Sequence, residues 1–157
     1  MIEGKAIIFG NNIDTDQILG AHHLVLPTIG EMAGYTFEHH AHFTSGFAKG
    51  DILVAGDNFG CGSSREQAAA VLKERGVAAV IARGFARIFF RNAINLGLQL
   101  IVCPEASEIA AKDKLTITAE KIRNETTGKE YAREPLPPFV AGILKSGGII
   151  PYLQKNR

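Results

Sequence analysis

The chain has 157 residues, of which 46% are hydrophobic and 21% charged, and its formal net charge is +1. This length and composition predict one globular domain with a substantial core. A charge so close to zero gives no reason to expect a nucleic acid or an anionic membrane as partner. The N-terminus lacks a signal-peptide pattern, and no apolar run approaches the ~20 residues of a membrane span, so we expect a cytoplasmic protein.

The cysteine content restricts the metal chemistry of the chain. Its two cysteines, Cys61 and Cys103, are far apart in the sequence and form no disulfide framework, which is typical of a reducing compartment. Two thiols cannot supply the four ligands of a structural zinc or iron–sulfur site. We therefore expect this chain to carry no metal site of that kind.

The first expected strand covers residues 5–9 and ends at the turn Gly10-Asn11-Asn12. Asp14 and Asp16 follow directly. Two interpretations remain open for them: local turns in which each carboxylate accepts backbone N–H groups, or a site that binds a cation or orients an arginine.

Residues 21–34 are expected to form a loop with a brief extended piece, because Pro27 and Gly30 interrupt any periodicity. Residues 32–42 are expected to hold a short helix. Three histidines near its end suggest a metal site at first: His39, His40 and His42. Neighbouring residues do not share a helix face, so a solvated helix end is the preferred interpretation.

Three near-continuous apolar runs are typical of strands covered on both faces: residues 52–55, 78–82 and 98–103. Two helical patterns separate them, residues 64–75 and 85–96, and Gly76 and Gly97 follow as stop signals. Strands that alternate with helices in this way predict a parallel sheet with right-handed crossovers. Ligands bind such sheets at the carboxyl ends of the strands.

The glycine-rich stretch 56–67 follows the first of these strands. Its three glycines allow positive φ angles and a close approach of backbone to a ligand. We expect Ser63 or Ser64 to cap the helix that follows, each with a capping-box partner three residues later. The helix start and the forked donor of Arg65 both suit an anion. The stretch therefore predicts an anion site with a hydroxyl beside it.

Alternative chemistries fit this stretch less well. It has neither the phosphate-loop nor the dinucleotide-binding glycine spacing, and Gly62-Ser63-Ser64 is not a nucleophile elbow. A carboxylate site remains, in which a serine could act as a base if fixed positive charge stabilised its alkoxide. A merely well-capped helix remains equally open.

Two further regions complete the expected organisation. Arg83, Arg87 and Arg91 form either a solvated basic edge or a basic flank of the anion site. Alternation over residues 115–118 and a turn within residues 120–131 predict a small antiparallel ribbon. A short amphipathic helix and a tail that packs back are expected beyond it, and nothing indicates a second domain.

The stretch 56–68 resembles the signature of the swivelling domain of the aconitase superfamily, most closely that of the small subunits of 3-isopropylmalate dehydratase and homoaconitase-type enzymes. Residues 10–18 and 84–95 match that family as well. The resemblance implies an α/β fold, a swivelling β/β/α domain over residues 1–157 whose central, largely parallel sheet is flanked by helices.

The resemblance also implies a function. Such a domain caps an active site on a separate large subunit, as a heterodimer or heterotetramer, and that partner carries a [4Fe–4S] cluster. The reaction is a dehydration–rehydration of a malate-type acid in which iron acts as a Lewis acid. The implied residue roles are Ser63 as the base, Ser64 and Arg65 as carboxylate ligands, and Asp16 in the active-site shell. Cys61 is implied to pack without binding the cluster.

Substrate choice is implied to lie in the loop after Asp-Thr-Asp. Homoaconitase-type chains carry Tyr-Leu-Arg-Thr there, and this chain carries His23-Leu24-Val25-Leu26. Val25 cannot neutralise a carboxylate as that arginine does, which favours an isopropyl or methyl substituent and an isomerase of 2- and 3-isopropylmalate in leucine biosynthesis. His23 in place of tyrosine leaves a 2,3-dimethylmalate or 2-methylcitrate relative open. A non-catalytic capping subunit is the alternative of another class.

Overall fold

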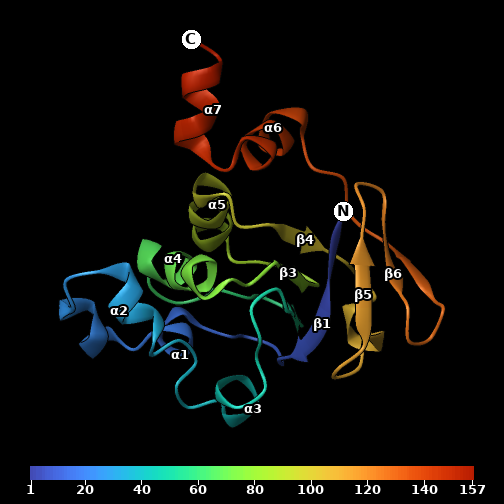
Figure 1. Ribbon diagram of the computed structural model, residues 1–157, viewed down its shortest axis with the longest axis horizontal. Helices are drawn as coiled ribbons and strands as arrows, with labels where there is room; N and C mark the ends of the chain where they lie inside the picture. Colours follow the sequence, from blue (N-terminus) through green and yellow to red (C-terminus); the bar gives the residue numbers. More distant parts are fainter.

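The computed structural model describes residues 1–157 and is built on one curled seven-stranded sheet of order β4-β3-β2-β1-β5-β6-β7 (Figure 1). The strands are β1 (Ile2–Ile8), β2 (Ile52–Ala55), β3 (Ala79–Ala82), β4 (Leu100–Val102), β5 (Lys114–Ile117), β6 (Lys121–Asn124) and β7 (Glu130–Ala132). Strands β1 to β4 pair in parallel, and β5 to β7 add an antiparallel ribbon. The predicted α/β class, parallel strands and ribbon are confirmed.

Strand β1 belongs to both halves of the sheet. Its second half, Ala6 to Ile8, pairs in parallel with β2, whereas its first half, Ile2 to Lys5, pairs antiparallel with β5. The expected strand over residues 5–9 was therefore placed too late. The residues that start β1 alternate in polarity, and only the distant partner β5 makes them a strand.

Helices α4 (Glu66–Arg75) and α5 (Arg87–Leu96) connect the parallel strands and pack on one face of the sheet (Figure 1). Both end at a glycine in the left-handed region, Gly76 with φ 87° and Gly97 with φ 81°, as predicted. Ala68, Val71 and Leu72 form a buried stripe on α4, whereas Ile88 on α5 is 52% exposed.

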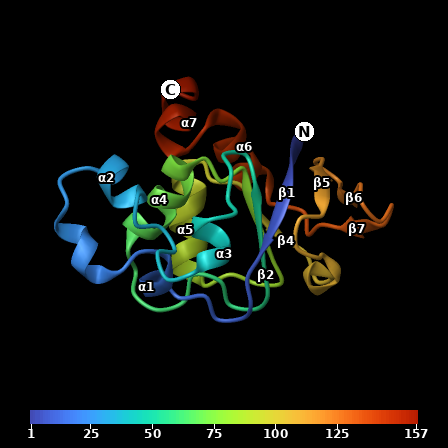
Figure 2. The ribbon, with the colours of Figure 1, turned by 60° about the horizontal axis from the view of Figure 1, so that its bottom comes forward.

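Successive residues of the parallel strands point into two different cores. Leu53, Val80 and Leu100 belong to the larger core, which α4 and α5 cover. Ile52, Ile81 and Ile101 belong to a smaller core closed by the curled ribbon β5–β7 (Figure 2). Burial on both faces explains why these strands are almost uninterrupted apolar runs.

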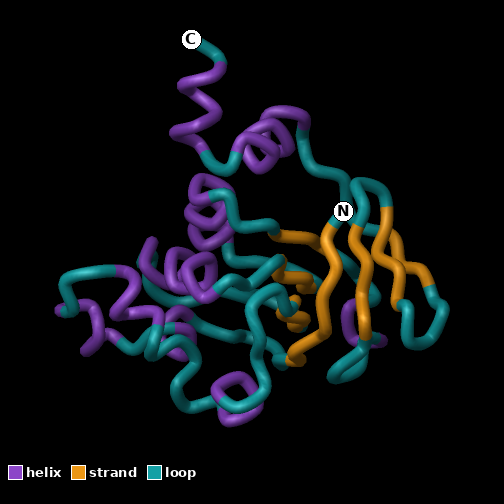
Figure 3. The backbone as a smooth tube through the Cα atoms, viewed as in Figure 1, coloured by secondary structure: helices purple, strands orange, loops and turns teal.

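The segment between β1 and β2 contains four short helical pieces: α1 (Thr15–Ile18), η1 (Ala21–Val25), α2 (Ile29–Ala33) and α3 (Ala41–Thr44) (Figure 3). The extended piece expected within residues 21–34 and the helix expected over residues 32–42 were both wrong. Thr28 starts a helix earlier, because its Oγ1 accepts the N–H of Glu31 at 3.1 Å. Phe37, fully buried with a positive φ of 49°, interrupts helical geometry after α2.

The C-terminal part adds η2 (Ala106–Glu108) and the helices α6 (Pro138–Ser146) and α7 (Ile149–Lys155). Ile143 and Leu144 anchor α6 in the larger core, and α7 lies next to it at the end of the chain (Figure 1). None of the helices is both long and apolar enough to span a membrane.

Candidate active site

Three loops converge where the parallel strands β1, β2 and β3 end. The backbone N–H groups of Gly56 and Gly60 donate to the carbonyls of Gly10 (3.1 Å) and Ile13 (2.7 Å), which ties the loop after β2 to the loop after β1. On the other side, Phe59 forms a parallel bridge with Phe85 in the loop after β3. Backbone hydrogen bonds thus fix the glycine-rich stretch 56–65 from both sides, at the edge of the sheet where ligands were expected.

Gly60 is constrained both by its backbone conformation and by its neighbours. Its φ of +86° lies in the left-handed region, and a Cβ added there would lie 2.2 Å from Cγ of the Phe89 ring. Phe89 belongs to α5 and is buried. The missing side chain therefore lets the loop press directly against α5, which sets the position of the residues that follow.

Gly60→Ala is expected to lower the free energy of unfolding by about 2–4 kcal/mol, because it adds a backbone cost to overpacking in the core. Two other glycines separate the cost of the backbone conformation from the cost of overpacking. Gly128 has a φ of +79° and open space, so Gly128→Ala should cost only about 1 kcal/mol. Gly10 has open space and no positive φ, so Gly10→Ala should change stability by less than about 0.5 kcal/mol. Urea denaturation measures all three, and equal losses would contradict the packing argument.

The two serines do not cap α4, so that prediction was wrong. The N-cap residue is Arg65, and no side chain accepts a hydrogen bond from the first turn of the helix. Ser63 and Ser64 lie in the loop before it, and both are exposed. Their hydroxyls are consequently available to a ligand rather than to the helix.

Thr15 holds Ser63 in place, and the sequence interpretation missed it. Its Oγ1 donates to the carbonyl oxygen of Ser63 at 3.1 Å and lies 3.4 Å from the Ser63 Oγ. The Thr15 side chain is buried, and its N–H donates to the carbonyl of Cys61 at 2.8 Å. A polar residue between two aspartates gave no signal of its own; only the pairing of the two loops shows its role.

Arg65 and Asp16 meet beside these serines. Nη1 of Arg65 donates to the carbonyl of Leu19 at 2.8 Å and lies 3.5 Å from Oδ1 of Asp16. The Arg65 side chain is only 19% exposed, whereas Asp16 is 69% exposed. Nε and Nη2 of Arg65 make no hydrogen bond within the chain, so two donors of the fork remain for a carboxylate.

Both aspartates accept a backbone N–H group, as the turn interpretation predicts, and Asp16 in addition lies near an arginine. Asp14 caps α1, because its Oδ1 accepts the N–H of Gln17 at 2.8 Å. Asp16 accepts the N–H of Ala21 at 3.2 Å and faces Arg65. The structure therefore brings together four of the predicted site residues: Ser63, Ser64, Arg65 and Asp16.

The basic residues after β3 have separate roles. Nε of Arg83 donates to Asp57 at 3.0 Å, its Nη2 donates to the other oxygen, and this pairing holds the pKa of the Asp57 carboxyl below its usual range. Arg87 and Arg91 are exposed and form no ion pair. Asn92 on α5 donates to the carbonyl of Ser64 at 3.4 Å. Of the three arginines, Arg83 is therefore paired, whereas Arg87 and Arg91 are solvated and unpaired.

The residues expected to choose the substrate lie on and just after η1. Val25 is 86% exposed, whereas Leu24 and Leu26 pack against the larger core. Of the three, Val25 is therefore the side chain that a ligand or partner can reach freely. Helix η1 begins at Ala21, whose N–H binds Asp16, so this segment is joined directly to the site.

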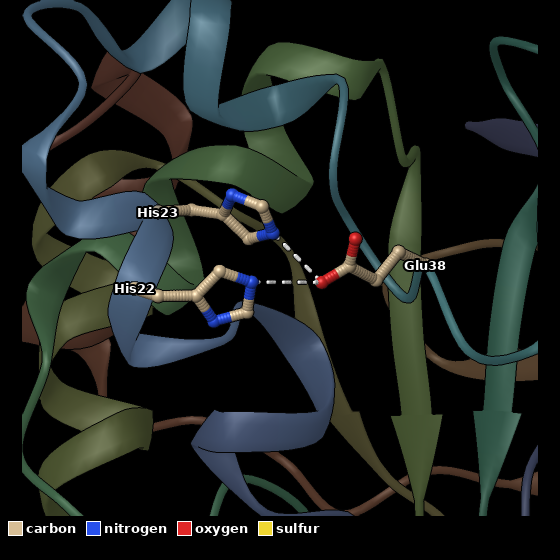
Figure 4. A group of neighbouring side chains, drawn as sticks. All are labelled: His22, His23 and Glu38. Atoms are coloured by element: carbon tan, nitrogen blue, oxygen red, sulfur yellow. Dashed lines mark hydrogen bonds and ion pairs between the residues drawn. The ribbon is translucent and has the colours of Figure 1, made fainter.

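The histidines assemble differently from the pattern considered in the sequence. His22, His23 and Glu38 form a group, with His23 Nε2 2.7 Å from Glu38 Oε1 (Figure 4). That hydrogen bond lowers the pKa of the Glu38 carboxyl. His40 and His42 instead lie against the Phe9 ring, and burial lowers the pKa of His40.

Comparison with known proteins extends over nearly the whole chain. A family model described as the aconitase C-terminal domain matches residues 39–106. The chain is 46% identical to 3-isopropylmalate dehydratase small subunit 1 of Archaeoglobus fulgidus, covering 98% of both chains. It is 47% identical to the 3-isopropylmalate dehydratase small subunit of Moorella thermoacetica, covering 99% of this chain and 96% of the relative. The crystal structure of a 3-isopropylmalate dehydratase from Methanocaldococcus jannaschii superposes with a TM-score of 0.93 at 40% identity, covering 99% and 94%.

Proposed function

The chain belongs to the family of 3-isopropylmalate dehydratase small subunits, and we propose that it is the small subunit of a two-subunit hydro-lyase that interconverts 2- and 3-isopropylmalate in leucine biosynthesis. One structural observation supports this proposal independently of the names of the chain's relatives. The exposed Ser63 hydroxyl and two free donors of Arg65 lie on the same fixed loop, at the carboxyl edge of the sheet. This arrangement suits a hydroxy acid, because the arginine donors can bind a carboxylate while the serine hydroxyl takes part in proton transfer.

We assign the proton transfer to Ser63. Its Oγ is exposed to the site, and Thr15 fixes its backbone and lies within 3.4 Å of the hydroxyl. Arg65 and Ser64 bind a substrate carboxylate, the former through Nε and Nη2 while Nη1 is held by the Leu19 carbonyl. Asp16 helps to orient the guanidinium. The positive charge of Arg65 also favours the deprotonated form of a nearby hydroxyl.

The [4Fe–4S] cluster of the family does not fit the residues of this chain. Cys103 is fully buried beneath the sheet, and burial raises the pKa of its thiol. Cys61 is then the one thiol near the site. We therefore propose that a large subunit holds the cluster, in a heterodimer or heterotetramer, and that this chain acts as one swivelling domain in a reducing cytoplasm, where both thiols stay free.

Reconstitution tests this proposal. The chain is mixed with the large subunit encoded in the same genome, with an intact cluster, and assayed on a panel of malate derivatives. We expect turnover of 2- and 3-isopropylmalate by the mixture and none by either chain alone. Turnover restricted to 2,3-dimethylmalate or 2-methylcitrate would place the chain with those relatives instead.

Val25→Arg is expected to shift the preference of the reconstituted enzyme toward homoaconitate. An exposed arginine can pair with the additional carboxylate of homoaconitate. One charge-assisted hydrogen bond of this kind should raise kcat/KM for homoaconitate, relative to that for isopropylmalate, by about 10- to 100-fold. Because Val25 is exposed, the change should leave stability intact. Val25→Met is the matched control for size, and kinetics in which both variants keep the original preference would contradict the assignment of this segment.

A further inference from the structure

The proposed reaction does not use a cluster of three side chains, two of which lie on the same short helix η1 as Val25: His22, His23 and Glu38 (Figure 4). Nε2 of His23 lies 2.7 Å from Oε1 of Glu38, and Nε2 of His22 and of His39 each lie 3.7 Å from the same oxygen. His39 does not belong to the group whose ligand atoms all lie close to one another. One ligand atom from each of the three residues lies within 4.8 Å of the others. The imidazoles come from η1 and the carboxylate from the turn after α2, so the cluster joins two separate segments.

The hydrogen bond between His23 and Glu38 does not account for the whole cluster. His22 is too far from the carboxylate for a hydrogen bond, yet its Nε2 is directed at the same oxygen (Figure 4). Gly20 leaves room for this ring, because a Cβ there would lie 2.9 Å from Cε1 of His22. The His23 ring is held by stacking on Tyr35, with centroids 3.9 Å apart.

We propose that His22, His23 and Glu38 bind a divalent transition-metal ion, Zn²⁺ in the first place. Zinc takes imidazole nitrogen and carboxylate oxygen at about 2.0–2.2 Å, which separates tetrahedral ligands by about 3.3 Å. The two observed separations from Oε1, 2.7 and 3.7 Å, lie on either side of that value. Imidazole ligands select zinc, cobalt or nickel over the oxygen-seeking Mg²⁺ and Ca²⁺.

The ion would fix the segment that carries Val25. It would connect η1 to the turn at Glu38 at a point where one hydrogen bond now holds them together. His22 is exposed at this point, which leaves the fourth coordination position open to water. Binding of the ion does not depend on the proposed reaction. Only the expected effect of the ion on substrate contacts through Val25 rests on the proposed function.

Zinc titration of the full chain tests the proposal. The chain carries no affinity tag, its accessible thiol is alkylated with iodoacetamide, and calorimetry follows the addition of Zn²⁺. We expect one ion per chain, and a loss of affinity of at least about tenfold in His22→Ala and in Glu38→Gln. The control is His42→Ala, since His42 lies against Phe9 outside the cluster. This variant should bind like the unmodified sequence, and Mg²⁺ should not bind.

A second measurement separates metal binding from a folding defect. His22 is exposed, so the metal-free His22→Ala variant should unfold at the same temperature as the parent chain. Zinc should slow amide hydrogen exchange over Ala21–Val25 in the parent and not in this variant. Absence of zinc binding, or equal zinc affinity in His22→Ala and His42→Ala, would overturn the proposal.

Discussion

Ser63→Ala is expected to lower kcat of the reconstituted enzyme by about two to four orders of magnitude, the usual contribution of a positioned general base. Assembly with the large subunit should not change. The serine hydroxyl makes no contact that α4 needs, because Arg65 occupies the N-cap position. The Ser63 hydroxyl lies 3.4 Å from that of Thr15, and the Thr15 hydroxyl keeps its bond to the Ser63 carbonyl in the variant. The expected loss is therefore chemical, not structural.

The matched control is Ser64→Ala, which removes the hydroxyl oxygen of the neighbouring serine. We expect this change to raise KM, because Ser64 is assigned to a carboxylate and not to the proton. Steady-state kinetics together with size-exclusion chromatography of the complex measure both variants. Full activity of Ser63→Ala would leave the chain only a capping or regulatory role, whereas equal kcat losses in both variants would reject the division of labour between the serines.

The parallel half of the fold could be predicted because it leaves a local signal. Strands buried on both faces must be apolar throughout, and Ile52 to Ala55 is completely buried, as that pattern indicates. Helices that end in a left-handed residue need glycine, which places Gly76 and Gly97. The first half of β1 left no such signal, since its partner is β5, more than a hundred residues away in the sequence.

The site could be predicted only in part, again because contacts between segments distant in the sequence determine it. Ser63 and Ser64 matched a capping pattern, but the loop extends two residues further and Arg65 takes that position. The contact between Thr15 and Ser63 joins loops 48 residues apart, and no spacing predicts it. The group of His22, His23 and Glu38 could not be predicted, because it joins two segments. Its histidines come from the short 3₁₀-helix η1, which has no recognisable pattern, and Glu38 comes from the turn after α2.

Arg65→Lys is expected to lower kcat/KM for isopropylmalate by about 100-fold, mostly through KM. The ammonium group keeps the charge but lacks the planar fork. In the native site Nη1 is already committed to the Leu19 carbonyl, which leaves Nε and Nη2 to bind a substrate carboxylate side by side. The donors of an ammonium group all lie on one nitrogen and cannot reproduce that paired geometry. Losing a charge-assisted hydrogen bond costs about 1.5–3 kcal/mol, which corresponds to about 10- to 150-fold.

Arg65→Gln should lose still more, because it also leaves Asp16 facing the substrate carboxylate without a cation between them. Arg123→Gln is the control for charge. It removes the same charge from the ribbon, where Arg123 makes only surface ion pairs with Glu125 and Glu130, and it should leave kcat/KM unchanged. Kinetics over a range of salt concentrations complete the test. If Arg65→Lys kept full kcat/KM, a point charge would suffice, and the fork geometry would not be what binds the substrate.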